Sequence, residues 1–143
     1  MFSASAFAGL GESESSVMRD AEKLGAAAPR PVEHTQNSGP LYTVHTLSKN
    51  GLTLREFVDT SGNIFALAWN GNAHPDLSQL LGTYLSDYKV ALQNSAPTPG
   101  QRRFGVLQGQ KVTVERSGLM GKSRGRAYVR SLIPAGVSLD EIQ

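Results

Sequence analysis

Residues 41–58 read LYTVHTLSKNGLTLREFV, and this run carries the clearest folding signal of the chain. Its two β-prone halves flank Asn50-Gly51, the residue pair that best tolerates the positive φ angles of a two-residue type I′ turn. A hairpin closed by this turn pairs Lys49 with Leu52, and this pairing fixes the register of both strands.

The register predicts which side chains share a face, because paired residues in neighbouring strands point to the same side of a sheet. His45 is expected opposite Glu56, as a polar pair on a face that also carries Leu47 and Leu54. The expected pairs are Thr43 with Val58, His45 with Glu56 and Leu47 with Leu54 on one face, and Val44 with Phe57 and Thr46 with Arg55 on the other.

A second turn over Asp59–Asn63, with Gly62 at its centre, leads into a third strand at Ile64–Asn70. Both faces of this strand are apolar, so it is predicted to lie inside the sheet and to offer its alanine side to another element. The three strands form a β-meander over 41–70. In strict alternation Phe65, Leu67 and Trp69 point one way, and Ile64, Ala66 and Ala68 the other.

One long amphipathic helix is predicted at 75–93, opened by Pro75 and Asp76, both favourable in a first helical turn. Gly82 in its middle costs about 1 kcal/mol relative to alanine. Apolar side chains at three- and four-residue spacing should cover one face of the sheet. They are Leu77, Leu80, Leu81, Tyr84, Leu85, Tyr88 and Leu92.

The other segments complete an α+β fold with an antiparallel sheet of five to six strands. The pattern predicts a short N-terminal helix at 13–24, an extended linker at 26–40, strands near 104–107, 111–116 and 126–133, a mobile basic loop at 118–125, and a capping box from Ser138 to Glu141.

Length and composition indicate a single domain. A chain of 143 residues with 39% hydrophobic and 18% charged residues buries enough surface for one core. It has no run of about 20 apolar residues, as a membrane helix needs. With no cysteine, it has neither disulfides nor thiolate metal sites.

The N-terminus suggests export. Ala6-Phe7-Ala8 fits the small-x-small pattern before a signal-peptidase cut, although the charged and apolar regions of a signal are missing. Residues 1–8 are therefore interpreted as the remnant of a signal peptide or, alternatively, as a disordered tail. Residues 9–143 are assigned to a single α+β domain.

The net charge of +2 conceals a basic C-terminal part. Residues 101–143 hold 8 Lys and Arg against 3 Asp and Glu, whereas residues 1–100 hold 6 against 9. Such a cationic face could attract an acidic glycan, a phospholipid headgroup or nucleic acid. Alternatively, the charges only protect a solvated edge strand from aggregation. The candidate ligand-binding residues are Arg102, Arg103, Arg116, Lys122, Arg124 and Arg126.

Motifs for other chemistry are weak. The run Gly118–Ser123 has Arg116 where a phosphate-binding loop needs glycine. His34, His45 and His74 lack metal-ligand spacing, so neither a metal nor a cofactor is expected. No Gly-x-Ser-x-Gly motif accompanies them.

Two polar pairs and one aromatic set remain as candidates. His45 with Glu56, or His74 with Asp76, could act as an acid/base couple in a small hydrolase or isomerase, but these pairs are more simply structural. The aromatic residues Phe65, Trp69, Tyr84 and Tyr88 could line a pocket, but their spacing is more typical of a core.

Several short runs form one pattern along most of the chain. They are Tyr42–His45, Arg55–Val58, Gly62, Phe65–Trp69, Pro75–Leu77, Leu80–Gly82 with Tyr84, and Gly125–Val129 with Pro134–Val137. Together they resemble the bacterial family named domain of unknown function 2844, over Leu10–Ile142. The resemblance implies a small exported protein with an N-terminal signal peptide, in the periplasm or outside the cell, and implies no activity. Lys122 and Ser123 depart from the more apolar or aromatic residues expected before the Gly-Arg-Ala strand.

These observations favour a non-enzymatic module that binds a protein or another envelope component. Binding of anionic ligands through the basic C-terminal hairpin region is the first alternative. Catalysis by one of the two histidine pairs is the second. No membrane span is expected, and nucleic acid is the least favoured anionic partner because no recognisable nucleic-acid module accompanies the charges.

Overall fold

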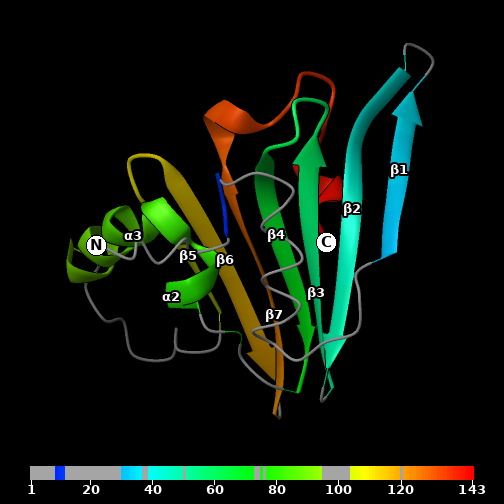
Figure 1. Cartoon of the computed structure of the whole chain (residues 1–143). Helices are drawn as coiled ribbons and strands as arrows, with labels where there is room; N and C mark the ends of the chain where they lie inside the picture. The colour runs from blue at the N-terminus through cyan, green and yellow to red at the C-terminus, as the bar shows by residue number, and fades with distance from the viewer. Residues whose placement is uncertain are drawn as a thin grey trace, which may run out of the picture.

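A seven-stranded antiparallel sheet forms the centre of the computed structural model (Figure 1). Its strand order is β1-β2-β3-β4-β7-β6-β5. The strands are β1 (Arg30–Gln36), β2 (Gly39–Lys49), β3 (Leu52–Asp59), β4 (Ile64–Gly71), β5 (Phe104–Gln108), β6 (Val112–Leu119) and β7 (Lys122–Val129). The structure describes residues 9–11, 30–36, 39–49, 51–72, 75, 77–94, 104–119 and 121–143.

The first hairpin has the predicted register. Lys49 pairs with Leu52, His45 with Glu56, and the ladder continues without a shift to Tyr42 and Asp59. Gly51 has a φ of 79°, the left-handed conformation that the turn requires and that glycine adopts at low cost. Asn50 lies outside the described residues.

The second turn also forms as predicted, but the strand after it contains a β-bulge. The Asp59 carboxylate accepts the backbone N–H groups of Ser61 and Asn63, both at 2.9 Å. The register with β3 then shifts, so that Phe65 has no partner of its own. A bulge of this kind turns one side chain to the opposite face.

The bulge corrects the predicted alternation of β4. Ile64 packs with Leu67 and Trp69, whereas Phe65 packs on the opposite face with Ala66 and Ala68. The prediction that Phe65 shares a face with Leu67 and Trp69 is therefore wrong. The interior position of β4, between β3 and β7, is confirmed, and residues 64–69 are all buried.

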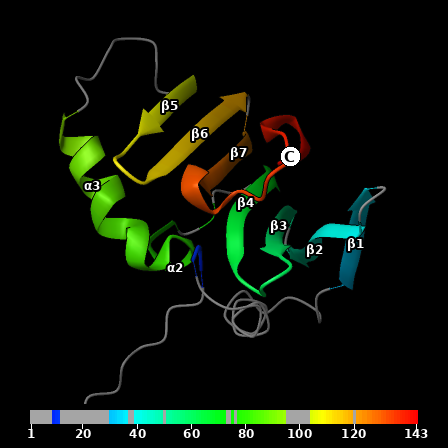
Figure 2. The same cartoon turned by 90° about the horizontal axis from the view of Figure 1, so that it is seen from above.

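Two hydrophobic clusters cover the two faces of the sheet. Leu80, Leu81 and Tyr88 of the helical segment pack on one face of the sheet, which we call the helix face. The C-terminal segment 130–143 packs on the opposite face through Leu139 and Ile142, and we call this the tail face. The two coverings lie on opposite sides of the sheet (Figure 2). The small Ala66 and Ala68 side chains thus accept another element, as predicted.

The predicted long helix at 75–93 is wrong. The segment is divided into α2 (Leu77–Leu80), the 3₁₀ turn η1 (Gly82–Tyr84) and α3 (Leu85–Asn94). Gly82 has a φ of +53°, which a continuous right-handed helix excludes. The break lets Leu80 and Leu81 both reach the core, and it leaves Leu92 exposed.

The N-terminal part of the sheet also differs from the prediction. Residues 26–40, expected to be a linker, contain β1, which pairs antiparallel with β2 and raises the number of strands from five or six to seven. Pro31 can lie in β1 because an edge strand needs partners on one side only. The predicted helix at 13–24 lies outside the described residues.

The C-terminal strands have other bounds than predicted: β6 continues to Leu119, and the strand predicted at 126–133 begins at Lys122 and already ends at Val129. Most of the run 118–125, expected to be a mobile loop, belongs to β6 and β7, and Leu119 pairs with Lys122 across a tight turn. Gly121 in that turn has a φ of 79°, so two turn residues suffice. After β7 the chain forms η2 (Arg130–Leu132) and η3 (Leu139–Glu141), and Ser138 and Glu141 make the predicted capping box.

Candidate functional site

The predicted basic residues do not all lie on one side of the sheet. Side chains alternate along a strand, so Lys122, Arg124 and Arg126 of β7 share the tail face, and Arg116 of β6 points to the helix face. We call Lys122, Arg124 and Arg126 the basic row. Arg102 and Arg103 lie outside the described residues.

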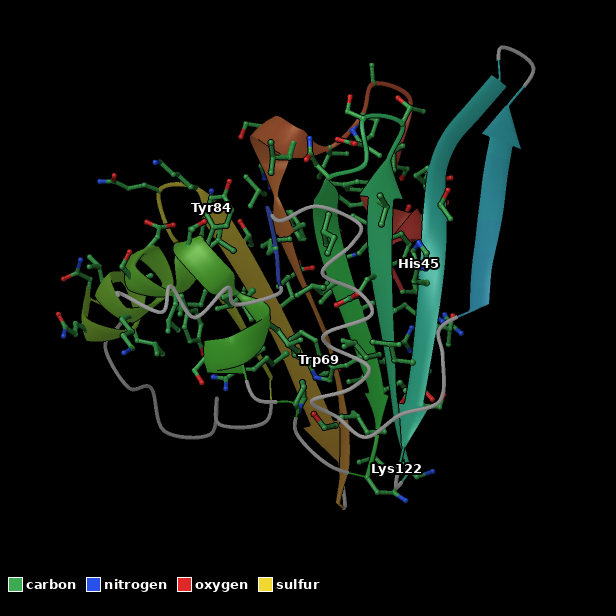
Figure 3. All side chains as sticks on the ribbon, in the orientation of Figure 1. His45, Trp69, Tyr84 and Lys122 are labelled. Atoms are coloured by element: carbon green, nitrogen blue, oxygen red, sulfur yellow. The ribbon has the colours of Figure 1, made fainter. Side chains whose placement is uncertain are left out.

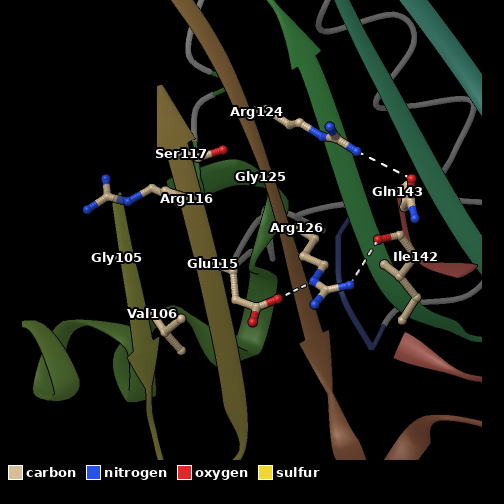
Figure 4. A pocket seen from close by; sticks show the side chains of 10 residues that line it. All are labelled: Gly105, Val106, Glu115, Arg116, Ser117, Arg124, Gly125, Arg126, Ile142 and Gln143. Atoms are coloured by element: carbon tan, nitrogen blue, oxygen red, sulfur yellow. Dashed lines mark hydrogen bonds and ion pairs between the residues drawn. The ribbon is translucent and has the colours of Figure 1, made fainter. Parts of the chain in front are cut away.

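An open groove of about 600 Å³ lies beside the basic row (Figure 4). It crosses β5, β6 and β7 on the tail face, and the C-terminal residues form one wall. We call it the basic groove. It is lined by Gly105, Val106, Glu115, Arg116, Ser117, Arg124, Gly125, Arg126, Ile142 and Gln143.

Arg126 is committed to internal contacts. Its guanidinium forms an ion pair with Glu115 and donates to the backbone oxygens of Leu139 and Ile142. It also lies 5.7 Å from the centre of the Tyr128 ring, within cation–π range. Arg126 therefore fastens the C-terminal segment to the sheet and neutralises the acid of the groove.

Arg124 and Arg55 converge on one residue. Arg124 Nη2 donates to the Gln143 side-chain oxygen at 3.3 Å, and Arg55 Nη1 donates to the Gln143 backbone oxygen at 2.8 Å. Both arginines are exposed. On β4, which lies between β3 and β7, Ala68 pairs with Arg55 and Asn70 pairs with Arg124.

A smaller hollow of about 160 Å³ lies on the other side of Gln143. Thr53, Arg55, Asn70 and Arg124 contribute to its lining. Two guanidinium groups with neighbouring hydroxyl and amide groups form a set of donors suited to a carboxylate or phosphate. Arg55 was not among the predicted site residues, since its approach to Arg124 depends on the pairing of β4 with β7.

His45 and Glu56 face each other as predicted, but they lie inside the protein. His45 is 7% exposed and Glu56 is 0% exposed, and Figure 3 shows His45 on β2, away from Lys122. Neither lines the basic groove or the smaller hollow. This burial favours the structural interpretation of the pair. His74 and Asp76 lie outside the described residues.

The aromatic residues belong to the core rather than to a pocket. Trp69 and Tyr88 are buried on the helix face, and Tyr84 packs against the same cluster. On the tail face, the Phe65 ring lies edge-on to Tyr42 and tilted against Phe57. The Trp69 ring nitrogen donates to Ser123 Oγ at 3.3 Å. Ser123 thus provides the hydrogen-bond acceptor for a buried indole.

Other site types find little support in the described residues. No group of three His, Asp or Glu side chains lies close enough to hold a metal ion in the part of the chain that the structure describes. Over the same residues, no helix has the length and apolar character needed to cross a membrane. Lys122 and Ser123 of the Gly-Lys-Ser run are the first residues of the strand β7, so the run lacks the helix N-terminus of a phosphate-binding loop.

Comparison with known proteins yields one family. Residues 6–142 match the family described as Protein of unknown function (DUF2844), which is nearly the whole chain. No curated protein and no solved structure matches the chain.

Proposed function

This chain belongs to the family described as Protein of unknown function (DUF2844), and from that premise we propose that it is an exported, non-enzymatic module that binds acidic groups of another envelope protein. The observation that carries the proposal is the convergence of exposed Arg55 and Arg124 between two hollows on the tail face. Lys122 adds a third cation to the same face.

The ligand class follows from the donors. A guanidinium presents paired N–H groups that match the two oxygens of a carboxylate. Arg124 donates to the neutral amide oxygen of the Gln143 side chain, and a hydrogen bond to a charged oxygen is stronger than one to a neutral oxygen. An acidic side chain of a partner can therefore replace this amide at Arg124 with a gain in free energy.

A protein partner is preferred over a glycan or phospholipid headgroup because the groove is mixed in character. Val106 and Ile142 lie within the same lining as Arg124. Protein interfaces combine apolar contact with arginine in this way. Export to the periplasm or outside the cell is part of the proposal, and it rests on Ala6-Phe7-Ala8 and the family resemblance.

The binding test uses an oligoglutamate peptide as probe, measured by calorimetry at two salt concentrations. The double variant Arg55→Gln/Arg124→Gln should lose at least about tenfold in affinity, since each charged hydrogen bond contributes about 1.5–3 kcal/mol. Affinity of the unaltered protein should fall as salt rises.

The matched control is Arg130→Gln/Lys111→Gln, which removes the same charge from exposed positions outside the groove. An equal loss of oligoglutamate affinity in both double variants would mean that only net charge matters, and it would contradict a binding site at Arg55 and Arg124. Oligoglutamine should not bind. Preference for phosphatidylglycerol vesicles or for an acidic glycan over oligoglutamate would overturn the choice of a protein partner.

The export part has its own test. The full-length gene product is expressed in its native host, fractionated, and its mature N-terminus is sequenced. Cleavage before Gly9 and recovery outside the cytoplasm are expected. Recovery of an unprocessed protein from the cytoplasm would contradict export, and it would not bear on the proposed binding site.

A further inference from the structure

The sheet ends at β5, and this edge has unusual properties. Within the part of the chain that the structure describes, β5 pairs only with β6. Its residues, Phe-Gly-Val-Leu-Gln, include no charge and no proline. Proteins usually protect an exposed edge strand with charged residues or proline. The sequence-based interpretation of an edge strand protected by its charges therefore does not apply to β5.

The hydrogen-bond pattern shows which backbone groups of β5 are open. Gly109 N–H donates to the Val112 oxygen at 2.8 Å, so Gly109 and Val112 form a hydrogen-bonded pair. Such pairs alternate along an antiparallel ladder. Leu107 and Gly105 therefore direct their N–H and C=O groups to β6, and Val106 and Gln108 direct theirs outward.

A hollow of about 400 Å³ lies directly beside this edge. Asp87, Val90, Ala91 and Asn94 of α3 form one wall, and residues 106–110 form the other. Val106 is 65% exposed and Val90 is 54% exposed. Two apolar side chains in water thus flank a row of open backbone groups.

The same edge carries a cation, Arg116, that forms no ion pair with an acidic side chain of the described residues. Arg116 pairs with Gly105, and Figure 4 shows its side chain extending from β6 toward β5 at that glycine. Because Gly105 has no side chain, Arg116 can reach over the edge strand. Glu115, its neighbour, points to the other face and is held by Arg126.

We propose that the β5 edge and its hollow bind an extended peptide segment of a partner protein, which adds as an eighth strand between β5 and α3. Main-chain hydrogen bonds to Val106 and Gln108 provide affinity, and alternate side chains provide specificity. The partner residue beside Gly105 is acidic and meets Arg116. The residue two positions away lies beside Leu107, faces Val90, and is a β-branched apolar residue.

A second copy of this chain fits the edge less well. Two β5 strands paired through Val106 would bring no acidic side chain to Arg116, because β5 contains none. The charge of the edge therefore favours a different, acidic segment. This site shares Val106 and Arg116 with the lining of the basic groove, but its hollow includes neither Arg55 nor Arg124.

The probe is the synthetic peptide acetyl-Ser-Val-Thr-Glu-Thr-Ser-amide, in which valine precedes glutamate by two positions, so that a strand antiparallel to β5 places glutamate beside Gly105 and valine beside Leu107. It is titrated into isotope-labelled full-length chain and followed by amide chemical shifts. Shifts are expected at Val106, Gln108 and Val90. A peptide with lysine in place of glutamate should bind at least tenfold more weakly.

Val106→Pro removes the outward N–H without removing a bond to β6, and should weaken binding at least tenfold. Its control, Val106→Thr, keeps the N–H and the branched side chain and should bind within about twofold of the unaltered chain. Arg116→Glu should reverse the preference and bind the lysine peptide more tightly. This charge reversal remains a test even if the proline variant does not fold.

Several results would overturn the proposal. The first is an absence of chemical-shift changes at millimolar peptide. The second is an unchanged peptide affinity in Val106→Pro. The third is a preference for the glutamate peptide over the lysine peptide that Arg116→Glu does not change. Self-association abolished by Val106→Pro would assign the edge to a second copy instead. Arg55→Gln/Arg124→Gln should leave the peptide affinity unchanged, so the two proposed sites fail independently.

Discussion

The Asp87 carboxylate of α3 accepts the backbone N–H of Val112 at 3.0 Å, where β6 begins. The same carboxylate accepts the N–H groups of Gln110 at 3.0 Å and Lys111 at 2.9 Å. One side chain therefore joins the helix to the turn between β5 and β6. It also sets the distance between α3 and the β5 edge, where we propose that a peptide binds.

Replacing Asp87 tests this link. Asp87→Asn keeps one accepting oxygen and places an NH₂ group against backbone donors, so at least one N–H loses its partner. We expect a loss of about 1–3 kcal/mol in the free energy of unfolding, measured by urea denaturation. Gln93→Ala, at an exposed position of the same helix, should change it by less than about 0.5 kcal/mol. Equal stability of both variants would show that the three bonds are not important.

The pH dependence of stability provides a second check on Asp87. Burial raises the pKa of this carboxyl, but hydrogen bonds from Val112, Lys111 and Gln110 outweigh it and lower the pKa below its ordinary 3.8. A carboxyl whose pKa is lowered in the folded state stabilises the protein at pH values above its ordinary pKa. This contribution to stability is lost as the pH falls through the pKa of the folded state. The stability difference between the unaltered chain and Asp87→Asn should therefore shrink as the pH falls below about 4. A constant difference down to pH 2 would contradict this.

Tyr42 gives the opposite pH dependence. Burial, followed by the hydrogen bond to Glu141 and its charge, raises the pKa of Tyr42 to about 12. The Tyr42 hydroxyl donates to Glu141 Oε1 at 3.1 Å and thereby holds η3 on the tail face. A raised pKa contributes stability at neutral pH that is lost as the pH rises from about 10 through about 12.

Phenolate absorbance measures this pKa directly. The difference between the unaltered chain and Tyr42→Phe isolates the titration of one of the four tyrosines. Glu141→Gln should lower the pKa of Tyr42, because it removes the neighbouring charge. Titration of Tyr42 near 10 in the unaltered chain would mean that η3 is not held against β2.

Local signals in the sequence predicted the features that depend on neighbouring residues. Asn50-Gly51 fixed the pairing of Lys49 with Leu52 because the turn leaves one register. The bulge at Phe65 and the break at Gly82 depend instead on how β4 and the helices fit the two sides of the sheet. The pattern of apolar residues alone does not contain that information.

The basic site shows the same limit. The cluster of Lys122, Arg124 and Arg126 was evident in the sequence, and so was their alternation once β7 was known. Arg55 could not be assigned to the site, since it joins Arg124 only because β4 pairs with β7 on its far side. The commitment of Arg126 to Leu139 depends on where the C-terminal segment packs.

Gly125 tests whether close packing or strand propensity dominates beside the basic row. A Cβ at this position would lie 2.3 Å from Trp69 Cζ2 and 2.6 Å from the Glu115 backbone oxygen. Strand propensity alone predicts that Gly125→Ala stabilises the chain by about 0.5–1 kcal/mol. The contacts predict the opposite, a loss of about 1–3 kcal/mol, because the indole ring and a backbone oxygen must both move.

Fluorescence reports the displacement, since Trp69 is the single tryptophan of the chain. Movement of the indole away from Ser123 should shift its emission, and the same movement should displace Arg124 and weaken oligoglutamate binding. Gly118→Ala is the control, because the nearest atom to its new Cβ is the Lys122 backbone oxygen at 3.1 Å and no ring is near. If Gly125→Ala proves more stable than the unaltered chain while Gly118→Ala does not, the indole does not pack on this glycine.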